Sequence, residues 1–521
     1  MYQSFVKLIF QHLIDPATHS KFWIKLLCSY AFYKTAYLCL FDPLRHVPGP
    51  WWSRFTSIPY QLERGLGTID RYSHSIHLKY GKTVRVGPTE VSVSKNKDVK
   101  QILSSYRYRK SDLYKLSMAV KENMITTLDE TFNRTRRRQV APAFSHSGLD
   151  TVEDLILQVG IIALKKKLDE ELVKGKGEYK INYYSVFQCV TADIIGELSF
   201  GKSFDAIKNE GHDILKWVQS FMKISVLCVI FPLTMKIPFF FPGLKYDREM
   251  LINYTAKSIK NRCDEIESNV YKPNRIDILQ MYITSNNPDG TKLSEDDLVS
   301  ESLLMLLAGT DTSSVTMSWL LHFYTLYPSI YKKVVREIDE FFPDRSKIIR
   351  YKDAQKKLVY FIATVYECMR LKPALSGVLP RTSSNEGIQL SDYYIPPNIE
   401  LFLVVEVANC DETVWDSPNK YMPERFLNEK GKSLTKELVT FSSGVRICPG
   451  RNLAWVEILT VMPNFIRDYE IRLMPDSFYR PDNIDANRDN EPLLFEDYVL
   501  GTRGISNYKN VCNVIISKRL T

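Results

Sequence analysis

The sequence lacks the short cysteine and histidine patterns of common metal-binding proteins. Its nine cysteines are scattered, with no CxxC pair and no cluster of histidine and cysteine, so zinc and iron–sulfur sites have little support. An odd number of scattered cysteines fits a reducing compartment rather than a disulfide framework. No linker rich in serine or glycine, no repeat and no low-complexity tract divides the 521 residues. No domain boundary inside the main part of the chain is therefore indicated.

The sequence also lacks a GxGxxG dinucleotide fingerprint, so the chain itself is not expected to bind a nicotinamide or flavin cofactor. Its net charge of +9 is modest for this length, and its basic residues form no repeated motif with aromatics between them. This balance fits an acidic protein partner or an anionic membrane surface better than nucleic acid. No small-residue cleavage site is evident near the N-terminus, which favours a retained anchor over a removed secretory signal.

An apolar, aromatic-rich stretch occupies residues 22–41 and ends at Asp42. A membrane-spanning helix needs about 20 such residues, so the stretch is long enough, but Lys25 and Lys34 interrupt it. Lys25 lies near one end, whereas Lys34 lies deeper, where a charge is costlier. The alternative is a surface helix of the folded domain. A second apolar stretch at residues 226–241 is broken by prolines, so it is either core or a loop that dips into lipid.

A long buried helix is predicted between Ser294, a helix cap, and Pro328. With roughly 33 residues it would be about 50 Å long, and its nearly uniform apolar character predicts a course through the core. The polar run 309–312 interrupts this character at its centre. Ala308 and Thr312 share one helix face, and Gly309 leaves room for a ligand against the backbone. Taken alone, the run also fits a helix kink with satisfied hydroxyls.

Cys448 lies between turn residues and two positions after the fixed positive charge of Arg446. A thiolate ligand of haem iron needs such a setting, because it must stay deprotonated and be held rigidly. Gly444 and Gly450 allow backbone N–H groups to approach the sulfur closely. Arg446 can reach a haem propionate. A buried structural cysteine is the alternative, but the pattern favours the ligand.

Phe441, Gly444, Arg446, Cys448 and Gly450 match the signature FxxGxRxCxG, so the chain resembles the cytochrome P-450 superfamily of haem-thiolate monooxygenases, in a fungal microsomal style. Three further motifs follow in the family's order. They are Ala308–Thr312, similar to the oxygen-activating AGxDT, Glu367–Arg370, similar to ExxR, and Met422–Phe426, which supplies Arg425 as the third member of the ExxR group.

The resemblance implies a mainly α fold with a minor β-sheet lobe, the cytochrome P-450 fold. It implies an N-terminal membrane anchor and hinge at residues 1–44 and a haem-thiolate catalytic domain at residues 45–521. It makes Cys448 the axial ligand of the iron and Asp311 and Thr312 the catalytic pair that delivers protons. The other roles that it carries over are a structural ionic network (Glu367, Arg370, Arg425), cofactor contacts (Arg446, Arg137, Arg381, Phe441, Gly444, Gly450) and a substrate pocket (Met305, Ala308, Leu375, Val378).

Arg137 takes its role from a WxxxR or HxxxR pattern in which this chain has Asn133 at the aromatic position. The neighbouring Arg134, Arg136 and Arg138 turn away from Arg137 at helical spacing. They are expected to form a basic face on which an acidic reductase docks.

The implied activity is insertion of one oxygen atom from O2 into a lipophilic molecule, by hydroxylation or epoxidation of a sterol, steroid, fatty acid, terpenoid or polyketide. The implied cofactor is haem b (iron protoporphyrin IX), while NADPH, FAD and FMN act only through a separate NADPH–cytochrome P-450 reductase. Cytochrome b5 and membrane lipid are further expected partners, and nucleic acid is not. The expected location is the endoplasmic reticulum membrane, with the catalytic domain on the cytosolic face.

Two alternatives stay open. One is a haem-thiolate isomerase or dehydratase that needs no electrons, although the intact pair Asp311 and Thr312 speaks against it. The other is a non-catalytic haem-binding sensor or carrier.

Overall fold

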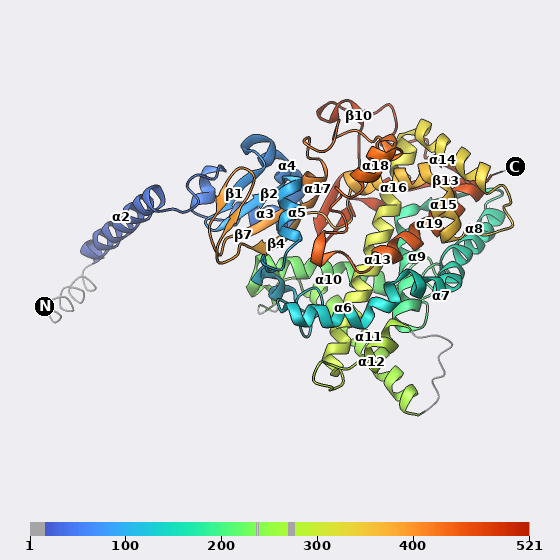
Figure 1. Ribbon diagram of the computed structural model, residues 1–521, viewed down its shortest axis with the longest axis horizontal. Coiled ribbons are helices and arrows are strands. Elements are labelled where there is room, and N and C mark those ends of the chain that lie inside the picture. The colour runs from blue at the N-terminus through green and yellow to red at the C-terminus, as the bar shows by residue number, and fades with distance from the viewer. Residues whose placement is uncertain (1–15, 236, 238, 269–276, 520–521) are drawn as a thin grey trace.

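The computed structural model describes residues 16–235, 237, 239–268 and 277–519. Most of the chain is a helical body with a small β lobe, and α2 (Pro16–Leu40) extends away from that body (Figure 1). The predicted mainly α fold with a minor β-sheet lobe is confirmed. The helices of the body are α3 (Ile58–Leu66), α4 (Ile69–Tyr80), α5 (Asn96–Leu103), α6 (Glu130–Phe144), α7 (His146–Leu157), α8 (Ala163–Lys174), α9 (Tyr183–Phe200), α10 (Asp213–Ile230), α11 (Pro242–Glu267), α12 (Ile278–Thr284), α13 (Glu295–Leu326), α14 (Pro328–Phe341), α15 (Tyr351–Lys357), α16 (Val359–Leu371), α17 (Val405–Asn409), α18 (Glu429–Leu434), α19 (Arg451–Asp468) and α20 (Tyr508–Val511).

The β lobe is built on a four-stranded sheet with the order β1 (Thr83–Gly87), β2 (Glu90–Val93), β7 (Glu400–Val404) and β4 (Val378–Thr382). β2 and β7 run parallel, and the other neighbours are antiparallel. Side chains alternate between the faces of a strand. Leu401 and Leu403 accordingly pack toward the cluster that includes α5, whereas Phe402 stacks on Tyr60 of α3, with 5.5 Å between ring centroids.

The remaining strands form smaller sheets at other places on the body. A three-stranded sheet has the order β3 (Glu178–Asn182), β13 (Asn513–Lys518) and β8 (Tyr469–Leu473). Two-stranded pairs are β5 (Ile388–Gln389) with β6 (Tyr394–Ile395), β9 (Ile484–Asp485) with β10 (Glu491–Pro492), and β11 (Asp497–Leu500) with β12 (Thr502–Ile505). The last pair is an antiparallel hairpin that turns at Gly501.

Helix α13 passes through the middle of the body (Figure 1). Ser294 and Asp297 form a reciprocal capping box that satisfies backbone N–H groups at its start. The helix is buried along most of its length and packs against α9. At Gly309 a Cβ atom would lie 2.6 Å from Ile195 of α9. The side of Gly309 on which a side chain would project is therefore filled by a neighbouring helix, while the residue itself stays partly exposed beside Ala308.

Packing of the catalytic body begins ahead of residue 45. Leu44 is fully buried in the cluster that also contains Val91, and Asp42 forms an ion pair with Arg85, whose side chain is 2% exposed. These two residues thus belong to the packed unit rather than to the segment before it. No helix within the described ranges is both long enough and apolar enough to cross a membrane.

Candidate functional site

The segment 441–448 folds into a tight loop that presents Cys448. The Cys448 N–H donates to the Phe441 carbonyl at 2.9 Å, and the Ile447 N–H donates to the Gly444 carbonyl at 3.3 Å. Gly444 has a φ of 59°, and a Cβ there would also collide with the backbone of Ser104 just after α5. Only glycine meets both demands. Gly450 lies on the sulfur side, because a Cβ there would stand 3.9 Å from Cys448 Sγ.

Cys448 keeps exposed surface although many protein atoms surround it. Burial raises the pKa of the Cys448 thiol. The N–H groups of Gly450 and Arg451 and the charge of Arg137 act in the opposite direction and favour the thiolate. A metal ion deprotonates a coordinating thiol outright. The surroundings therefore suit a thiolate ligand that forms when a metal binds.

A group of cations lies near the cysteine loop. Arg446 pairs with Glu130 through one terminal nitrogen, while its buried Nη1 has no hydrogen-bond partner within the described part of the chain. The backbone of Lys110 forms an isolated antiparallel β-bridge with that of Arg381 in β4. Burial, together with the nearby charges of Arg446 and Arg381, lowers the pKa of Lys110 well below its ordinary value. Glu130 supplies one carboxylate among these cations, so the cluster fits the two propionates of a haem.

Lys110 is not among the site residues predicted from the sequence. No motif marks this lysine, and only the pairing of its backbone with Arg381 brings it to the cation cluster. Its ammonium group donates to the carbonyls of Met124, at 3.4 Å, and Ile125. A lone lysine in a run of basic and aromatic residues carries no sequence signal for this role.

Arg137 and Asn133, the two residues of the predicted propionate-binding pattern, both form hydrogen bonds to the protein backbone. Arg137 donates to the Ile447 carbonyl at 2.8 Å, which fastens α6 to the cysteine loop. Asn133, at the aromatic position, is buried and donates its amide to the Met124 carbonyl at 2.6 Å. This amide donor is therefore used by the protein itself.

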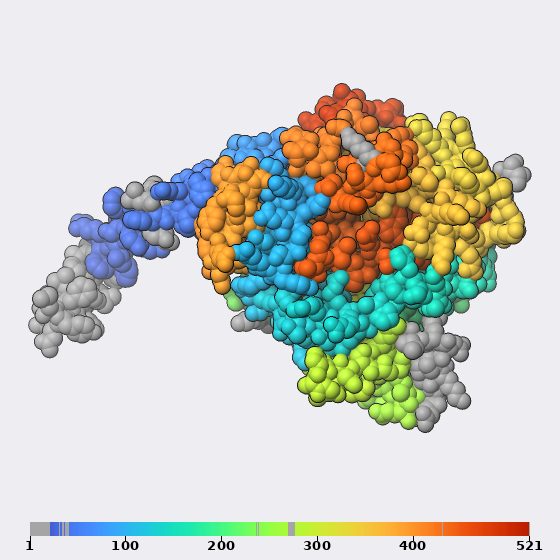
Figure 2. Space-filling model, in the orientation of Figure 1, coloured from blue at the N-terminus to red at the C-terminus, as the bar shows by residue number. Residues whose placement is uncertain are grey.

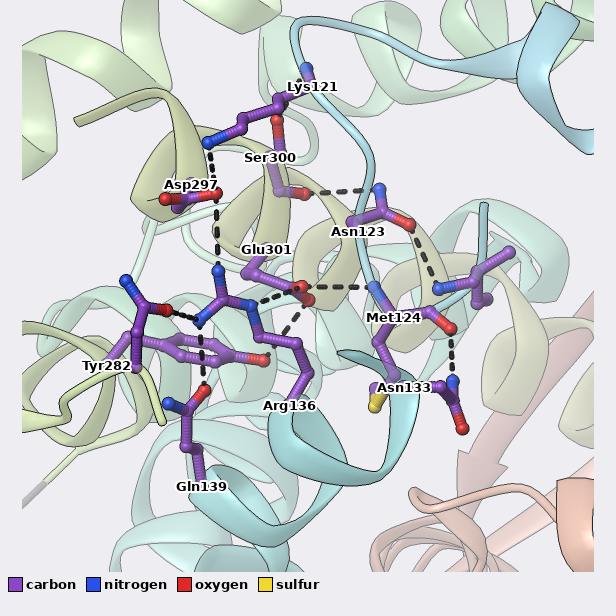
Figure 3. A network of polar contacts seen from close by, with 12 residues as sticks. Lys121, Asn123, Met124, Asn133, Arg136, Gln139, Tyr282, Asp297, Ser300 and Glu301 are labelled. Carbon is purple, nitrogen blue, oxygen red and sulfur yellow. Dashed lines mark hydrogen bonds and ion pairs between the residues drawn. The ribbon is translucent and has the colours of Figure 1, made fainter. Parts of the chain in front are cut away.

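Arg136 does not belong to a surface face. Figure 3 shows its guanidinium among acidic side chains, 3.2 Å from Asp297 Oδ1 and 3.5 Å from Glu301 Oε1. Burial raises the pKa of Glu301 to about 8, although Arg136 acts in the opposite direction. The expected basic face is wrong for Arg136, whereas Arg134 and Arg138 are exposed.

The same network fastens the loop before α6 to α13 (Figure 3). The Lys121 N–H donates to Ser300 Oγ at 2.9 Å, and the Met124 N–H donates to Glu301 Oε1 at 3.0 Å. Ile125, between these anchors and α6, stays 45% exposed. Ile125 therefore offers exposed apolar surface that the sequence did not indicate.

The predicted pocket residues have different surroundings. Ala308 is exposed in the middle of the otherwise buried α13, and Leu375 is 41% exposed. Met305 is instead buried in the main core, and Val378 packs partly against the cluster that contains Tyr60. Ala308 and Leu375 are thus the predicted residues with free apolar surface.

The two members of the predicted proton pair point to different partners. Thr312 Oγ1 donates to the Ala308 carbonyl at 2.9 Å. Asp311 is 5% exposed, and its Oδ2 accepts a hydrogen bond from Thr502 Oγ1 at 3.2 Å. Burial raises the pKa of Asp311 to about 6. This value suits a group that both holds and releases protons near neutral pH.

Glu367, Arg370 and Arg425 lie together. Arg370 donates to both carboxylate oxygens of Glu367, at 2.8 and 2.9 Å, and Arg425 Nε donates to Oε1 at 3.1 Å. Glu367 and Arg370 are fully buried. Arg370 also donates to the Pro418 carbonyl at 2.7 Å. The group ties α16 to η5 (Pro423–Phe426) and to the segment that leads to the cysteine loop.

Comparisons with known proteins identify the family of this chain. A family model described as cytochrome P-450 matches residues 47–486. Cytochrome P-450 monooxygenase helB1 of Aspergillus fumigatus is 31% identical over 486 residues, which are 92% of this chain and 82% of that protein. The monooxygenase helB2 of the same species is 32% identical over 455 residues, 85% of this chain and 88% of that protein. Cytochrome P-450 monooxygenase acrD of Aspergillus aculeatus is 27% identical over 458 residues, 86% and 90% of the two chains. This chain belongs to the cytochrome P-450 family, whose cofactor is haem, and is an oxygen-incorporating oxidoreductase.

Proposed function

We propose that this monooxygenase hydroxylates or epoxidises a lipophilic small molecule, with electrons that come from NADPH through a separate diflavin reductase. The observation that carries the substrate class is the apolar nature of the exposed side chains at two predicted pocket positions and at Ile125. Ala308, Leu375 and Ile125 are all uncharged and apolar. A sterol, steroid, fatty acid, terpenoid or polyketide fits this surface, because burial of apolar area is the main source of affinity there.

Different residues of the chain would bind the iron and the propionates of the haem. Cys448 would hold the iron of the haem, and Arg446, Arg137, Arg381 and Lys110 would bind its propionates. When bound, the haem supplies the one-electron and dioxygen chemistry. In the balanced reaction, substrate, O2, NADPH and one proton give hydroxylated product, water and NADP+.

Asp311 and Thr312 supply protons for the water that forms. Thr312 Oγ1 passes a proton to the oxygen that leaves as water, and the carboxyl group of Asp311 replaces it. The hydroxyl of Thr312 donates to the Ala308 carbonyl in this structure, so this hydrogen bond would have to open before the hydroxyl donates elsewhere.

A reductase docks beside the cysteine loop. Arg134 and Arg138 are exposed on α6, and Arg451 is exposed just after the loop. Because Arg137 fastens α6 to the loop, these cations offer an acidic partner a short route to Cys448. Cytochrome b5 would use the same face.

The membrane contact uses α2 and an exposed apolar surface on the body. Space-filling Figure 2 shows α2 projecting from the body. Helix α10, which leads into the exposed loop before α11, packs against α3. The exposed apolar side chains on α3, on the segment just before α3 and on the loop between α10 and α11 are Trp51, Phe55, Ile58, Leu62, Phe231, Leu233, Phe239, Phe240 and Phe241. Such a patch suits the endoplasmic reticulum membrane, with the catalytic body on the cytosolic face.

The test is a reconstitution of the purified protein with NADPH–cytochrome P-450 reductase. Haem spectral shifts are screened first with lauric acid, ergosterol and a sesquiterpene, and products are then identified by mass spectrometry. We expect oxygen-dependent NADPH consumption and a product heavier by one oxygen atom. Turnover without reductase would establish the isomerase alternative, and spectral binding without any turnover would favour the sensor.

A further inference from the structure

The hairpin β11–β12 reaches α13 at Asp311. Thr502, the first residue of β12, donates from Oγ1 to Asp311 Oδ2 at 3.2 Å, and both side chains are buried. The second carboxylate oxygen, Oδ1, has no hydrogen-bond partner in the described ranges. Asp311 is therefore oriented toward a hairpin that lies 191 residues away in the chain.

The hairpin is held rigidly next to Thr502. The neighbouring Arg503 is fully buried and forms ion pairs with Asp497, with Asp70 at 2.7 Å and with Glu406 at 2.7 Å. Successive residues of a strand point to opposite sides. Thr502 thus turns toward α13, while Arg503 turns toward a cluster of buried carboxylates.

Arg503 also connects the hairpin to the predicted pocket wall. Its backbone N–H donates to the Ala374 carbonyl at 2.8 Å, and its Nε donates to the Pro373 carbonyl at 3.1 Å. Leu375, the next residue, has the exposed apolar surface described above. One short hairpin therefore connects Asp311 to the segment that carries the predicted pocket residue Leu375.

Few other groups face Asp311. Burial is the main cause of its raised pKa, and Thr502, Gln188 of α9 and the charge of Lys223 on α10 oppose that effect. Tyr184 of α9 and Tyr498 of β11 also face it, and burial raises the pKa of each above the ordinary value. Both phenols are neutral near pH 7, so a hydroxyl donor, rather than a paired cation, fixes this acid.

We propose that Thr502 is a positioning residue for the monooxygenase reaction, whose hydroxyl orients Asp311 and stabilises its ionised form. The inference rests on the proposed role of Asp311 in proton delivery. A donor to the carboxylate favours the charged form, so Asp311 gives up its proton near neutral pH and can take up another. Without that donor the buried acid keeps its proton at higher pH, and its exchange of protons with Thr312 slows.

The test is an infrared titration of the resting holoprotein without substrate. The carboxyl band of protonated Asp311 is identified by its loss in Asp311→Asn. Thr502→Val removes the hydroxyl and keeps the side chain's shape. We expect it to raise the titration midpoint of Asp311 by about one to two pH units, the size expected for loss of a hydrogen bond to a charged group. Thr502→Ser restores a hydroxyl and should titrate as the wild type does.

Thr460→Val is the matched control, because Thr460 is a buried threonine whose hydroxyl bonds carbonyls of its own helix α19. It should leave the Asp311 midpoint unchanged. If the Thr502→Val protein does not fold, Thr502→Ala replaces it, and the same increase in the titration midpoint of Asp311 is expected. An unchanged midpoint in a folded, haem-loaded Thr502→Val or Thr502→Ala variant would overturn the proposal. Thr312→Ala tests the proton relay separately, because loss of that hydroxyl should alter product coupling and leave the Asp311 midpoint in place.

Discussion

At the scale of single residues, Asp311 shows how the site and the fold make opposing demands. A buried carboxyl group is more stable with its proton, and burial raises the pKa of Asp311 to about 6 from an ordinary 3.8. Proton delivery needs the group to ionise in the same place. The folded protein therefore loses stability whenever Asp311 becomes charged.

This conflict predicts a pH-dependent effect of Asp311→Asn. The folded chain binds the Asp311 proton more tightly than the unfolded chain, so this group's stabilising contribution is present at low pH and is lost as the pH rises through about 6. The amide side chain of the Asp311→Asn variant does not ionise, so the variant's stability does not fall in this way as the pH rises. The free energy of unfolding of Asp311→Asn relative to wild type should rise by about 1–2 kcal/mol between about pH 5 and about pH 8. Melting curves of both proteins at the two pH values measure it, and an equal gap at both would contradict the assignment.

Thr312→Ala should separate electron use from product formation. The hydroxyl is proposed to pass a proton, and a general acid–base contribution is about 10²–10⁴-fold. The variant should continue to oxidise NADPH but divert much of the reducing power to hydrogen peroxide or excess water. Product formed per NADPH oxidised is the measurement, with Thr316→Val, on the same helix, as control. Equal coupling in wild type and Thr312→Ala would remove this hydroxyl from the mechanism.

Cys448→Ala should abolish the thiolate-type spectrum of the reduced carbon monoxide complex. No other described cysteine lies in a comparable loop beside Arg137 and Arg446, and several are buried in the core. The spectrum of the reduced, carbon monoxide-treated protein measures the effect. Cys410→Ala is the control, and it should keep the wild-type spectrum. A normal spectrum in Cys448→Ala would refute the ligand assignment.

At the scale of elements, buried hydrogen bonds and ion pairs between helices and loops hold together the segments that form the site. Glu367 of α16 accepts from Arg370 and Arg425, and Glu301 of α13 accepts from the Met124 N–H of the loop before α6. Each carboxylate fixes a segment that is distant in the chain. Charged groups are suited to this task, because a buried charge without its partner is strongly unfavourable.

Glu367→Ala should therefore damage folding rather than chemistry. It leaves Arg370 fully buried without its carboxylate, at a cost of about 3–5 kcal/mol. The matched control is Glu424→Ala, which breaks the half-exposed pair of Glu424 with Lys333 and should cost less than about 1 kcal/mol. Haem content and melting temperature measure both. A Glu367→Ala protein with full haem, normal stability and slow turnover would show that the role is catalytic.

At the scale of the whole molecule, the boundary between anchor and body is set by packing. The predicted boundary at residues 44 and 45 leaves Asp42 with the anchor, yet Asp42 pairs with the buried Arg85. We therefore propose that the catalytic unit begins at Asp42. The apolar surface of the body, including Phe239 and Phe241, remains available to a membrane without α2.

Two truncations test this boundary. A chain that starts at Asp42 after its initiator methionine should bind haem and melt close to the full-length protein. A chain that starts at Arg45 loses the partner of Arg85 and the buried Leu44, and should be less stable by about 3–5 kcal/mol. Both should bind phospholipid vesicles more weakly than the full chain. Equal melting temperatures for the two truncations would place the boundary at residue 45 after all.

The sequence by itself determined the family, the helix-rich architecture and the residues of the main motifs. The loop around Cys448, the cap at Ser294 and the spacing of Glu367 and Arg370 are local patterns, and a local pattern fixes backbone geometry or faces of one helix without the rest of the fold. The tertiary structure alone decided the partners: Lys110 joins the cations, Arg136 is buried, and Thr502 orients Asp311. These contacts join segments far apart in the chain, so they depend on how whole elements pack, which no short stretch of sequence specifies.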